Sequence, residues 1–256
     1  MLKEIIRKIF NKLGYNISAI IKDTGVISFP ADFEDLHKNV IAEVKDFTMT
    51  SPERLFGLIE GVKYIAKKGI TGDVVECGVW KGGSMMAIAE TLKYVNDTKR
   101  TLYLYDTFSG MPAPTEEDRD FDNVDAGKRL HDEKDNKENS IIWAYSALPE
   151  VDAAMKQTGY NENLINYIEG KVEDTIPKTI SDKIALLRLD TDWYESTKHE
   201  LEHLFPRLSK NGILIIDDYG FWKGSRKAVD EYFAKLKLPI LLNRMDDTGR
   251  ICIKPF

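Results

Sequence analysis

An α/β fold with a mostly parallel sheet is predicted for this chain of 256 residues, from three observations. From about residue 53 onward, short apolar runs alternate with longer segments of helical periodicity, which is the pattern of strand–helix–strand units. Several of the apolar runs end in acidic residues or in a glycine-rich turn, as strands do at the ligand-binding edge of such a sheet. The last two runs flank residues 246–249 (DDTG), which predicts a C-terminal antiparallel hairpin.

The individual elements follow from local signals. Ser51, Pro52 and Glu53 supply an N-cap, a proline at the first helical position and an acidic first turn, so a helix is expected over residues 53–68. Further helices are expected over residues 84–95, 195–208 and 225–236. Strands are expected over residues 73–77, 101–105, 166–169, 184–189, 213–216, 240–244 and 250–253.

Composition excludes several classes of protein. The formal net charge of −6 disfavours a nucleic-acid-binding surface, which is normally basic. Cys77 and Cys252 are the only cysteines, so a dense disulfide framework is excluded, and a reduced, cytoplasmic protein is expected. The sequence has no run of about 18 apolar residues, so it predicts no transmembrane helix.

Two segments depart from the alternation. Residues 1–50 are expected to form a helical extension or cap, ahead of a main domain over residues 51–256. Within it, residues 1–13 have the spacing of an amphipathic helix with a basic polar face, which packs on protein or lies on a membrane surface. Residues 111–139 are rich in proline and charge, in an insertion that ends at about residue 145. An insertion of this length is interpreted as a mobile lid, or alternatively as a solvated loop.

Carboxylates end two consecutive strand-like runs. Asp190 and Asp192 follow the run over residues 184–189, and Asp217 and Asp218 follow the run over residues 213–216. Parallel strands bring such ends to one edge of the sheet, where clustered carboxylates hold a cation or a proton. On an extended strand Asp190 and Asp192 point the same way, with Asp192 further past the edge. The alternative is that these residues only cap the following helices.

A second constellation indicates a nucleoside-containing cofactor. The first strand-to-helix turn has the spacing Glu-x-Gly-x-x-x-Gly-Gly over residues 76–83, which lets a ligand approach the backbone and the helix N-terminus. The dinucleotide spacing Gly-x-Gly-x-x-Gly is absent, which disfavours a nicotinamide oxidoreductase. Asp106 ends the second strand, where an acidic residue can accept both ribose hydroxyls.

The chain resembles the macrocin O-methyltransferase family, whose members methylate sugar hydroxyls with S-adenosylmethionine. The matching motifs are TMTSPER (residues 48–54), VECGVW (75–80), YDTFSGMP (105–112), LRLDTDWYEST (187–197) and IDDY (216–219). The resemblance implies a Rossmann-like class I methyltransferase fold with a seven-stranded sheet. It also implies that Asp190, Asp217 and Asp218 hold Mg²⁺ and that Asp192 is the general base. The cofactor-binding residues that it implies are Thr50, Ser51, Glu76, Gly78, Ser84, Asp106, Ser109, Glu173 and Asp174.

The predicted function is therefore Mg²⁺- and S-adenosylmethionine-dependent methylation of a hydroxyl on a sugar or glycosylated small molecule, by a homo-oligomer, namely a dimer. A weakly nucleophilic hydroxyl needs both a cation and a base, which the acidic cluster supplies. One alternative is a catechol-type methyltransferase, in which Trp193 and Trp222 form an apolar slot; another is a non-catalytic scaffold for glycan synthesis. His199 and His203 lie in an H-E-x-x-H pattern, but a zinc protease would leave the strand-end acids unexplained.

Overall fold

The computed structural model describes residues 29–237 and 239–256. The chain divides into two compact units, Met1–Asp32 and Phe33–Phe256, and the second unit holds all the features described below. The amphipathic helix predicted for residues 1–13 lies outside the described residues. The extension predicted over residues 1–50 includes, among its described residues, the helix α2 (Asp35–Val44) and the short 3-10 helix η1 (Lys45–Phe47).

The second unit is built on a seven-stranded sheet with the strand order β3-β2-β1-β4-β5-β7-β6. The first five strands in this order pair in parallel, while β7 pairs antiparallel with both β5 and β6. The predicted α/β fold and its antiparallel C-terminal hairpin are thus confirmed. The strands are β1 (Asp73–Cys77), β2 (Leu102–Asp106), β3 (Ile165–Glu169), β4 (Ile184–Leu189), β5 (Leu208–Ile216), β6 (Asn243–Arg244) and β7 (Arg250–Ile253).

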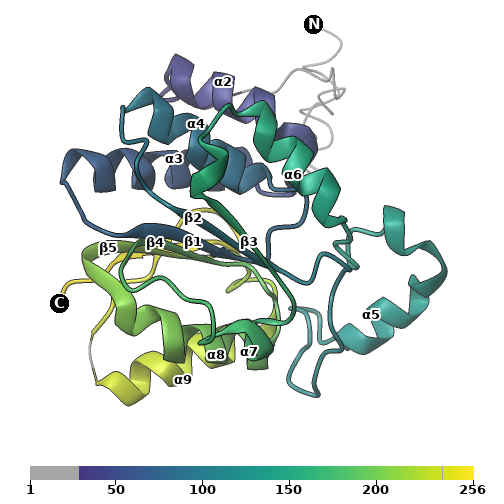
Figure 1. The fold of residues 1–256 in the computed structure, drawn as a ribbon. Coiled ribbons are helices and arrows are strands. Elements are labelled where there is room, and N and C mark those ends of the chain that lie inside the picture. Colours follow the sequence, from purple (N-terminus) through teal and green to yellow (C-terminus); the bar gives the residue numbers. More distant parts are fainter. Residues whose placement is uncertain (1–28, 238) are drawn as a thin grey trace, which may run out of the picture. The chain divides into compact units, whose positions relative to one another are not determined.

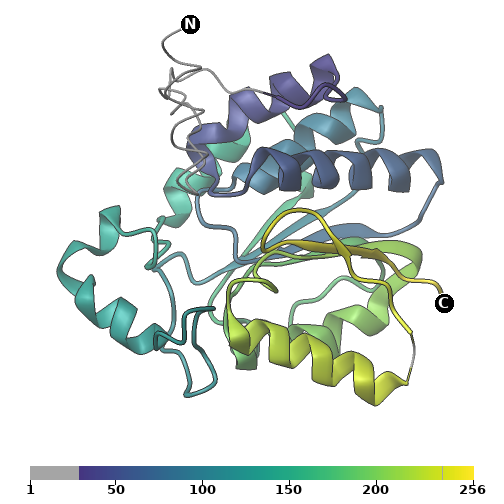
Figure 2. The ribbon, with the colours of Figure 1, turned by 180° about the vertical axis from the view of Figure 1, so that it is seen from behind.

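Helices cover both faces of the sheet (Figure 1). One face carries α2, α3, α4 and α6, and the other carries α7, α8 and α9, which the view from behind also shows (Figure 2). No helix among residues 29–237 and 239–256 is long and apolar enough to cross a membrane. Besides α2, the helices are α3 (Pro52–Lys67), α4 (Gly83–Tyr94), α5 (Ala126–Asp132), α6 (Leu148–Gln157), α7 (Val172–Thr175), α8 (Tyr194–Leu204) and α9 (Lys223–Leu236).

Local sequence explains the start and the orientation of α3. Pro52 stands in the first turn, and the Ser51 side chain accepts a hydrogen bond from the backbone N–H of Arg54 at 3.1 Å, as the sequence predicts. Leu55, Leu58 and Ile59 begin a fully buried stripe that continues to Ile65. This stripe packs the helix on the sheet, so the residues just before α3 are held beside the carboxyl ends of the strands.

The insertion after β2 contains α5 and a short 3-10 helix, η2 (Lys134–Asn139), and α5 projects to one side of the sheet in both ribbon views (Figures 1 and 2). The sequence shows few large apolar residues here, yet Ala126 and Leu130 are buried against Trp193 and Trp222. The two tryptophans lie in the loops that follow β4 and β5. The insertion therefore contacts the loops that carry the acidic residues, and its mobility stays a prediction.

Candidate active site

A cavity of about 290 Å³ opens at the carboxyl ends of the parallel strands. Its wall includes the turn after β1, the end of β2, and the loops after β3, β4 and β5. Residues of the insertion, among them Met111, Ile141 and Ile142, add an apolar side to this wall. Ligands bind at this edge in open α/β sheets.

Close backbone approach shapes the turn between β1 and α4. Gly78 has φ +82°, and a Cβ on it would overlap the backbone carbonyl of Asp190. Gly82, the N-cap of α4, has φ +89° and offers no side chain to the helix N-terminus. The first amide groups of α4 are therefore available to a polar ligand group near Ser84, which lines the cavity.

Asp106 holds this turn from the end of β2. Its Oδ2 accepts hydrogen bonds from the backbone N–H groups of Val79 and Trp80 at 2.7 and 3.0 Å, and its Oδ1 accepts one from Phe108 at 2.8 Å. Burial raises the pKa of the Asp106 carboxyl, and these three hydrogen bonds act in the opposite direction. Asp106 thus organises the cavity wall, and its predicted ribose contact would use the remaining acceptor capacity of the carboxylate.

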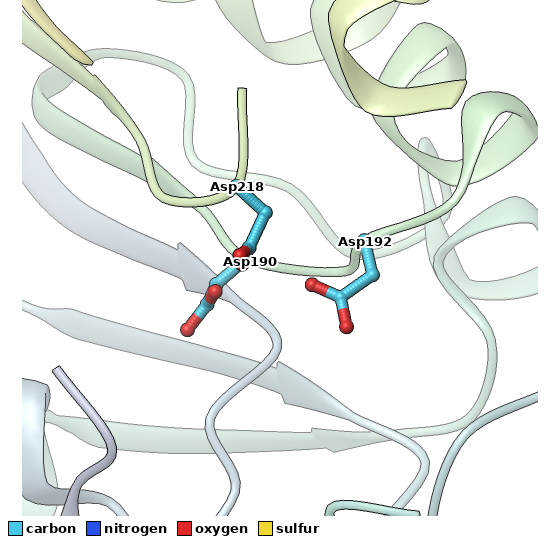
Figure 3. A group of neighbouring side chains, drawn as sticks. All are labelled: Asp190, Asp192 and Asp218. Atoms are coloured by element: carbon cyan, nitrogen blue, oxygen red, sulfur yellow. The ribbon is translucent and has the colours of Figure 1, made fainter. Parts of the chain in front are cut away.

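Three carboxylates converge on one side of the cavity. Asp190 and Asp192 come from the loop after β4, and Asp218 comes from the loop after β5 (Figure 3). One oxygen of each lies within 4.8 Å of the others. Burial, followed by repulsion from Asp190, raises the pKa of Asp192 to about 8, and burial raises the pKa of Asp190 and Asp218 well above the usual range. Such a set of oxygen donors fits a hard divalent cation.

Asp217 lies next to this group but is engaged differently. Its Oδ1 accepts a hydrogen bond from Nη2 of Arg188 at 2.5 Å, and its Oδ2 pairs with Nη1 of Arg54. The described residues therefore gather Asp190, Asp192 and Asp218, whereas the family resemblance implied Asp190, Asp217 and Asp218 as the ligands. The assignment of particular aspartates to a metal stays a prediction.

The geometric argument for Asp192 was wrong, although the residue does face the cavity. Strand β4 ends at Leu189, so strand alternation does not extend to Asp192. Asp192 instead has φ +68°, a left-handed conformation that costs about 1–3 kcal/mol for a residue with a side chain. Nor do these aspartates cap helices, since the N-caps of α8 and α9 are Trp193 and Trp222. A strained residue in a carboxylate cluster indicates a functional constraint.

Comparison with known proteins identifies the family. The sequence model of the macrocin O-methyltransferase family (TylF) matches residues 34–253. The chain belongs to this family. It is 35% identical over 202 residues to a Streptomyces olivaceus enzyme named 8-demethyl-8-(2,3-dimethoxy-alpha-L-rhamnosyl)-tetracenomycin-C 4'-O-methyltransferase, covering 79% of this chain and 73% of the relative. It is 34% identical to the mycinamicin III 3''-O-methyltransferase of Micromonospora griseorubida, covering 72% and 69% of the two chains.

Solved structures agree with this membership. The O-methyltransferase NovP is 30% identical and superposes with a TM-score of 0.71, over 82% of this chain and 83% of that one. The calicheamicin methyltransferase CalS11, 16% identical with a TM-score of 0.59 over 93% and 99% of the chains, shares the fold. The protein is therefore an S-adenosylmethionine-dependent O-methyltransferase rather than a non-catalytic scaffold.

Two arginines of this methyltransferase did not figure in the predicted site. Arg188, only 2% exposed, pairs with Glu76, with Asp190 at 2.8 Å and with Asp217, and it donates a hydrogen bond to Oγ1 of Thr50 at 3.0 Å. The sequence does contain a signal for the role of Arg188, because this residue is a charged side chain within the otherwise apolar run of residues 184–189. Buried charges need partners, so the acidic residues around it were its expected partners.

Arg54 is the second of these arginines. It pairs with Asp217 and, through Nε, with Asp246 at 2.8 Å, so it links the start of α3 to the loop after β5. The motif of residues 48–54 includes Arg54, but nothing in its spacing showed that it would reach residues 163 and 192 positions away.

The predicted cofactor residues divide into two groups. Glu76 is fully buried beneath Arg188, and burial raises its pKa to about 7 against the opposing effect of that arginine. Ser51 caps α3 and donates a hydrogen bond to Oδ2 of Asp246 at 2.6 Å. Thr50, Gly78, Ser84, Asp106 and Glu173 line the cavity, whereas Ser51, Glu76, Ser109 and Asp174 do not.

The histidine pair of α8 is not part of the site. The rings of His199 and His203 lie 4.4 Å apart, and Nε2 of His199 is 2.9 Å from the carbonyl oxygen of Ile176. Neither residue lines the cavity, and the cluster of possible metal ligands found in the described residues is made of aspartates alone. The rejection of a zinc protease is consistent with this arrangement.

Proposed function

We propose that this methyltransferase binds S-adenosylmethionine along the β1–α4 turn and Asp106, binds Mg²⁺ beside Asp190 and Asp218, and methylates a hydroxyl of a sugar or glycosylated small molecule. The observation that carries the proposal is the convergence of three carboxylates around the strained Asp192 in the wall of the cavity. Asp217 is the remaining candidate ligand, provided that an oxygen is released from Arg54 or Arg188.

Asp192 acts as the general base in this proposal. Transfer of a methyl group to a hydroxyl releases one proton, and a carboxylate with a pKa near the working pH is suited to accept it. Burial and the negative charge of Asp190 raise the pKa of Asp192 to about 8, and a divalent cation bound beside it would lower this pKa, which favours the ionised form that a base needs. When bound, a divalent cation supplies positive charge that favours loss of the hydroxyl proton, and the sulfonium cofactor supplies the methyl group. Asp190 and Asp218 hold the cation, and the left-handed turn orients Asp192 toward the acceptor.

Two observations support a glycosylated acceptor. A relative at 35% identity is named for a substrate that carries a rhamnosyl group. The cavity also combines the carboxylates with apolar side chains, including Met111, Ile142 and Phe221, which suit an apolar group attached to a polar sugar. The same apolar wall would accept a catechol, so that alternative is tested alongside.

The deciding experiment is a methyl-transfer assay with labelled S-adenosylmethionine and a panel of rhamnosides, sugar nucleotides and catechols, with Mg²⁺ or with chelator. Methylation of a sugar hydroxyl that is lost in chelator would support the proposal. Efficient methylation of catechols alone would mean that the acceptor is an aromatic diol and not a sugar. Full activity in chelator would mean that the reaction does not depend on a metal. The predicted dimer is checked separately by light scattering.

A further inference from the structure

Helix α8 begins directly after the loop that carries Asp190 and Asp192, yet no side chain of this loop caps it. Its N-cap is Trp193, whose side chain makes no capping hydrogen bond. The acceptor comes instead from the insertion, where Oδ1 of Asp118 receives a hydrogen bond from the backbone N–H of Tyr194 at 2.7 Å. The two residues are 76 positions apart. A carboxylate at a helix N-terminus is favourable, because it meets free N–H groups and the positive end of the helix dipole.

The Asp118 carboxylate is itself fixed in place. Asp118 is fully buried, and its Oδ2 accepts hydrogen bonds from the backbone N–H and the hydroxyl of Thr115 at 2.7 and 2.9 Å. The first turn of α9 closes over it, since a Cβ on Gly224 would overlap Oδ1 of Asp118. Asp118 does not line the cavity, so its Oδ1 is directed at the start of α8 rather than at a ligand.

Further contacts connect the insertion to both loops that carry the carboxylates. The indole Nε1 of Trp193 donates a hydrogen bond to the carbonyl of Pro112 at 3.0 Å. After β5, the backbone N–H of Lys223 donates to the carbonyl of Arg119 at 2.8 Å. Residues 112–119 therefore lie against the two loops whose aspartates converge in Figure 3.

We infer that Asp118 is a positioning residue for the methyl-transfer reaction, which holds the residue 190–193 loop so that Asp192 keeps its left-handed conformation beside the acceptor. The inference rests on the proposed role of Asp192 as base. Asp192 lies two residues before Tyr194, and its unfavourable φ persists only where the surroundings fix it. Loss of the Tyr194 hydrogen bond frees the first turn of α8 and lets the loop relax away from the reactive geometry.

Three variants and a matched control test this inference. Asp118→Ala removes the acceptor, Gly224→Ala displaces the carboxylate by steric overlap, and Asp118→Asn keeps an oxygen for the Tyr194 amide. Asp125→Ala is the control, because Asp125 caps α5 in the same insertion through a 3.0 Å hydrogen bond from Lys128 and makes no hydrogen bond to α8.

The first readout is hydrogen exchange of the Tyr194 amide, with S-adenosylhomocysteine and Mg²⁺ present. Asp118→Ala should accelerate it by about 2- to 30-fold, the range for loss of a helix cap, and Asp125→Ala should leave it unchanged. The second readout uses the best acceptor of the panel. Asp118→Ala and Gly224→Ala should lower kcat by about 10- to 100-fold with KM and S-adenosylhomocysteine affinity within about twofold, and Asp118→Asn should recover most of kcat.

Unchanged exchange at Tyr194, or faster exchange with unchanged kcat, would overturn the inference. An equal loss of kcat in Asp125→Ala would also overturn it, since the effect would then reflect general loosening of the insertion. The proposed role of Asp192 as base is tested separately, because full turnover of Asp192→Asn would contradict that role and not the role of Asp118. Should Asp118→Ala not fold, Gly224→Ala and Asp118→Asn carry the same two readouts.

Discussion

Removal of the Arg188 guanidinium should destabilise the protein strongly. This side chain is the shared partner of three carboxylates, those of Glu76, Asp190 and Asp217, and it is 2% exposed. Arg188→Met keeps an unbranched side chain, comparable to the aliphatic part of arginine, and removes the charged guanidinium. Glu76 then remains fully buried, with Oε1 deprived of its partner and Oε2 already without one among the described residues.

The expected loss of unfolding free energy is about 3–5 kcal/mol, the usual cost of leaving a buried charge unpaired. Total stabilities are about 5–15 kcal/mol, so the variant should be near the limit of folding. The loss should grow with pH. The pKa of Glu76 is raised to about 7 in the folded state, above its value of about 4.3 in the unfolded state. Between these two pH values the unfolded chain loses this proton first, so a rise in pH favours the unfolded state. Without Arg188 this pKa rises further.

Urea unfolding in chelator, followed by circular dichroism at about pH 5 and about pH 8, measures both effects. The double variant Glu76→Gln/Arg188→Met should recover part of the loss and flatten its pH dependence. Arg226→Met is a control, because both Arg226 and its partner Asp230 are exposed and such surface pairs contribute only about 0–1 kcal/mol. A loss below about 1 kcal/mol in Arg188→Met, or one independent of pH, would refute the reasoning.

Four further outcomes are expected. Asp192→Asn should retain S-adenosylhomocysteine binding and lower turnover by about 10²–10⁴-fold, and normal turnover would exclude this base. Chelation should abolish methyl transfer and Mg²⁺ should restore it, with Asp218→Asn requiring more Mg²⁺; equal Mg²⁺ requirements in variant and wild type would argue against Asp218 as a ligand. Asp106→Ala should weaken S-adenosylhomocysteine binding in calorimetry by about 1.5–3 kcal/mol, since the β1–α4 turn loses its acceptor, and an unchanged affinity would contradict this. Ser51→Ala should cost about 1 kcal/mol of unfolding free energy with no change in affinity, and the reverse result would restore its predicted contact with the cofactor.

Local patterns predicted most of the fold. Strands β1, β4 and β7 begin and end where alternation and apolar runs placed them, because such signals depend on neighbouring residues. The start of β5 was missed: the strand begins at Leu208, five residues early, and contains Asn211 at φ +63° and Gly212. In a sequence, polar residues next to glycine indicate a turn. Only knowledge of the neighbouring strand shows that they belong to a strand instead.

The site was less accessible to sequence reasoning. The acidic residues were found because each follows an apolar run. Which of them pair with an arginine, and which face one another, depends on the contacts of Arg54 and Arg188 with Asp217, which form only in the folded chain. The role of Asp118 was not predicted, for the same reason. A single aspartate in a charged insertion looks solvated, and only its distance to Tyr194 shows otherwise.

The ion pair of Glu76 and Arg188 has a consequence for how the sheet assembles. The two residues are direct neighbours across β1 and β4. A slip of one residue between these strands would turn the guanidinium to the opposite face, into the apolar layer occupied by Leu187 and Leu189. Only the native alignment satisfies the charges at the centre of the sheet. The chain therefore cannot complete its core in a wrong register and still bury Arg188, so correct strand pairing and assembly of the carboxylate site are one event in folding.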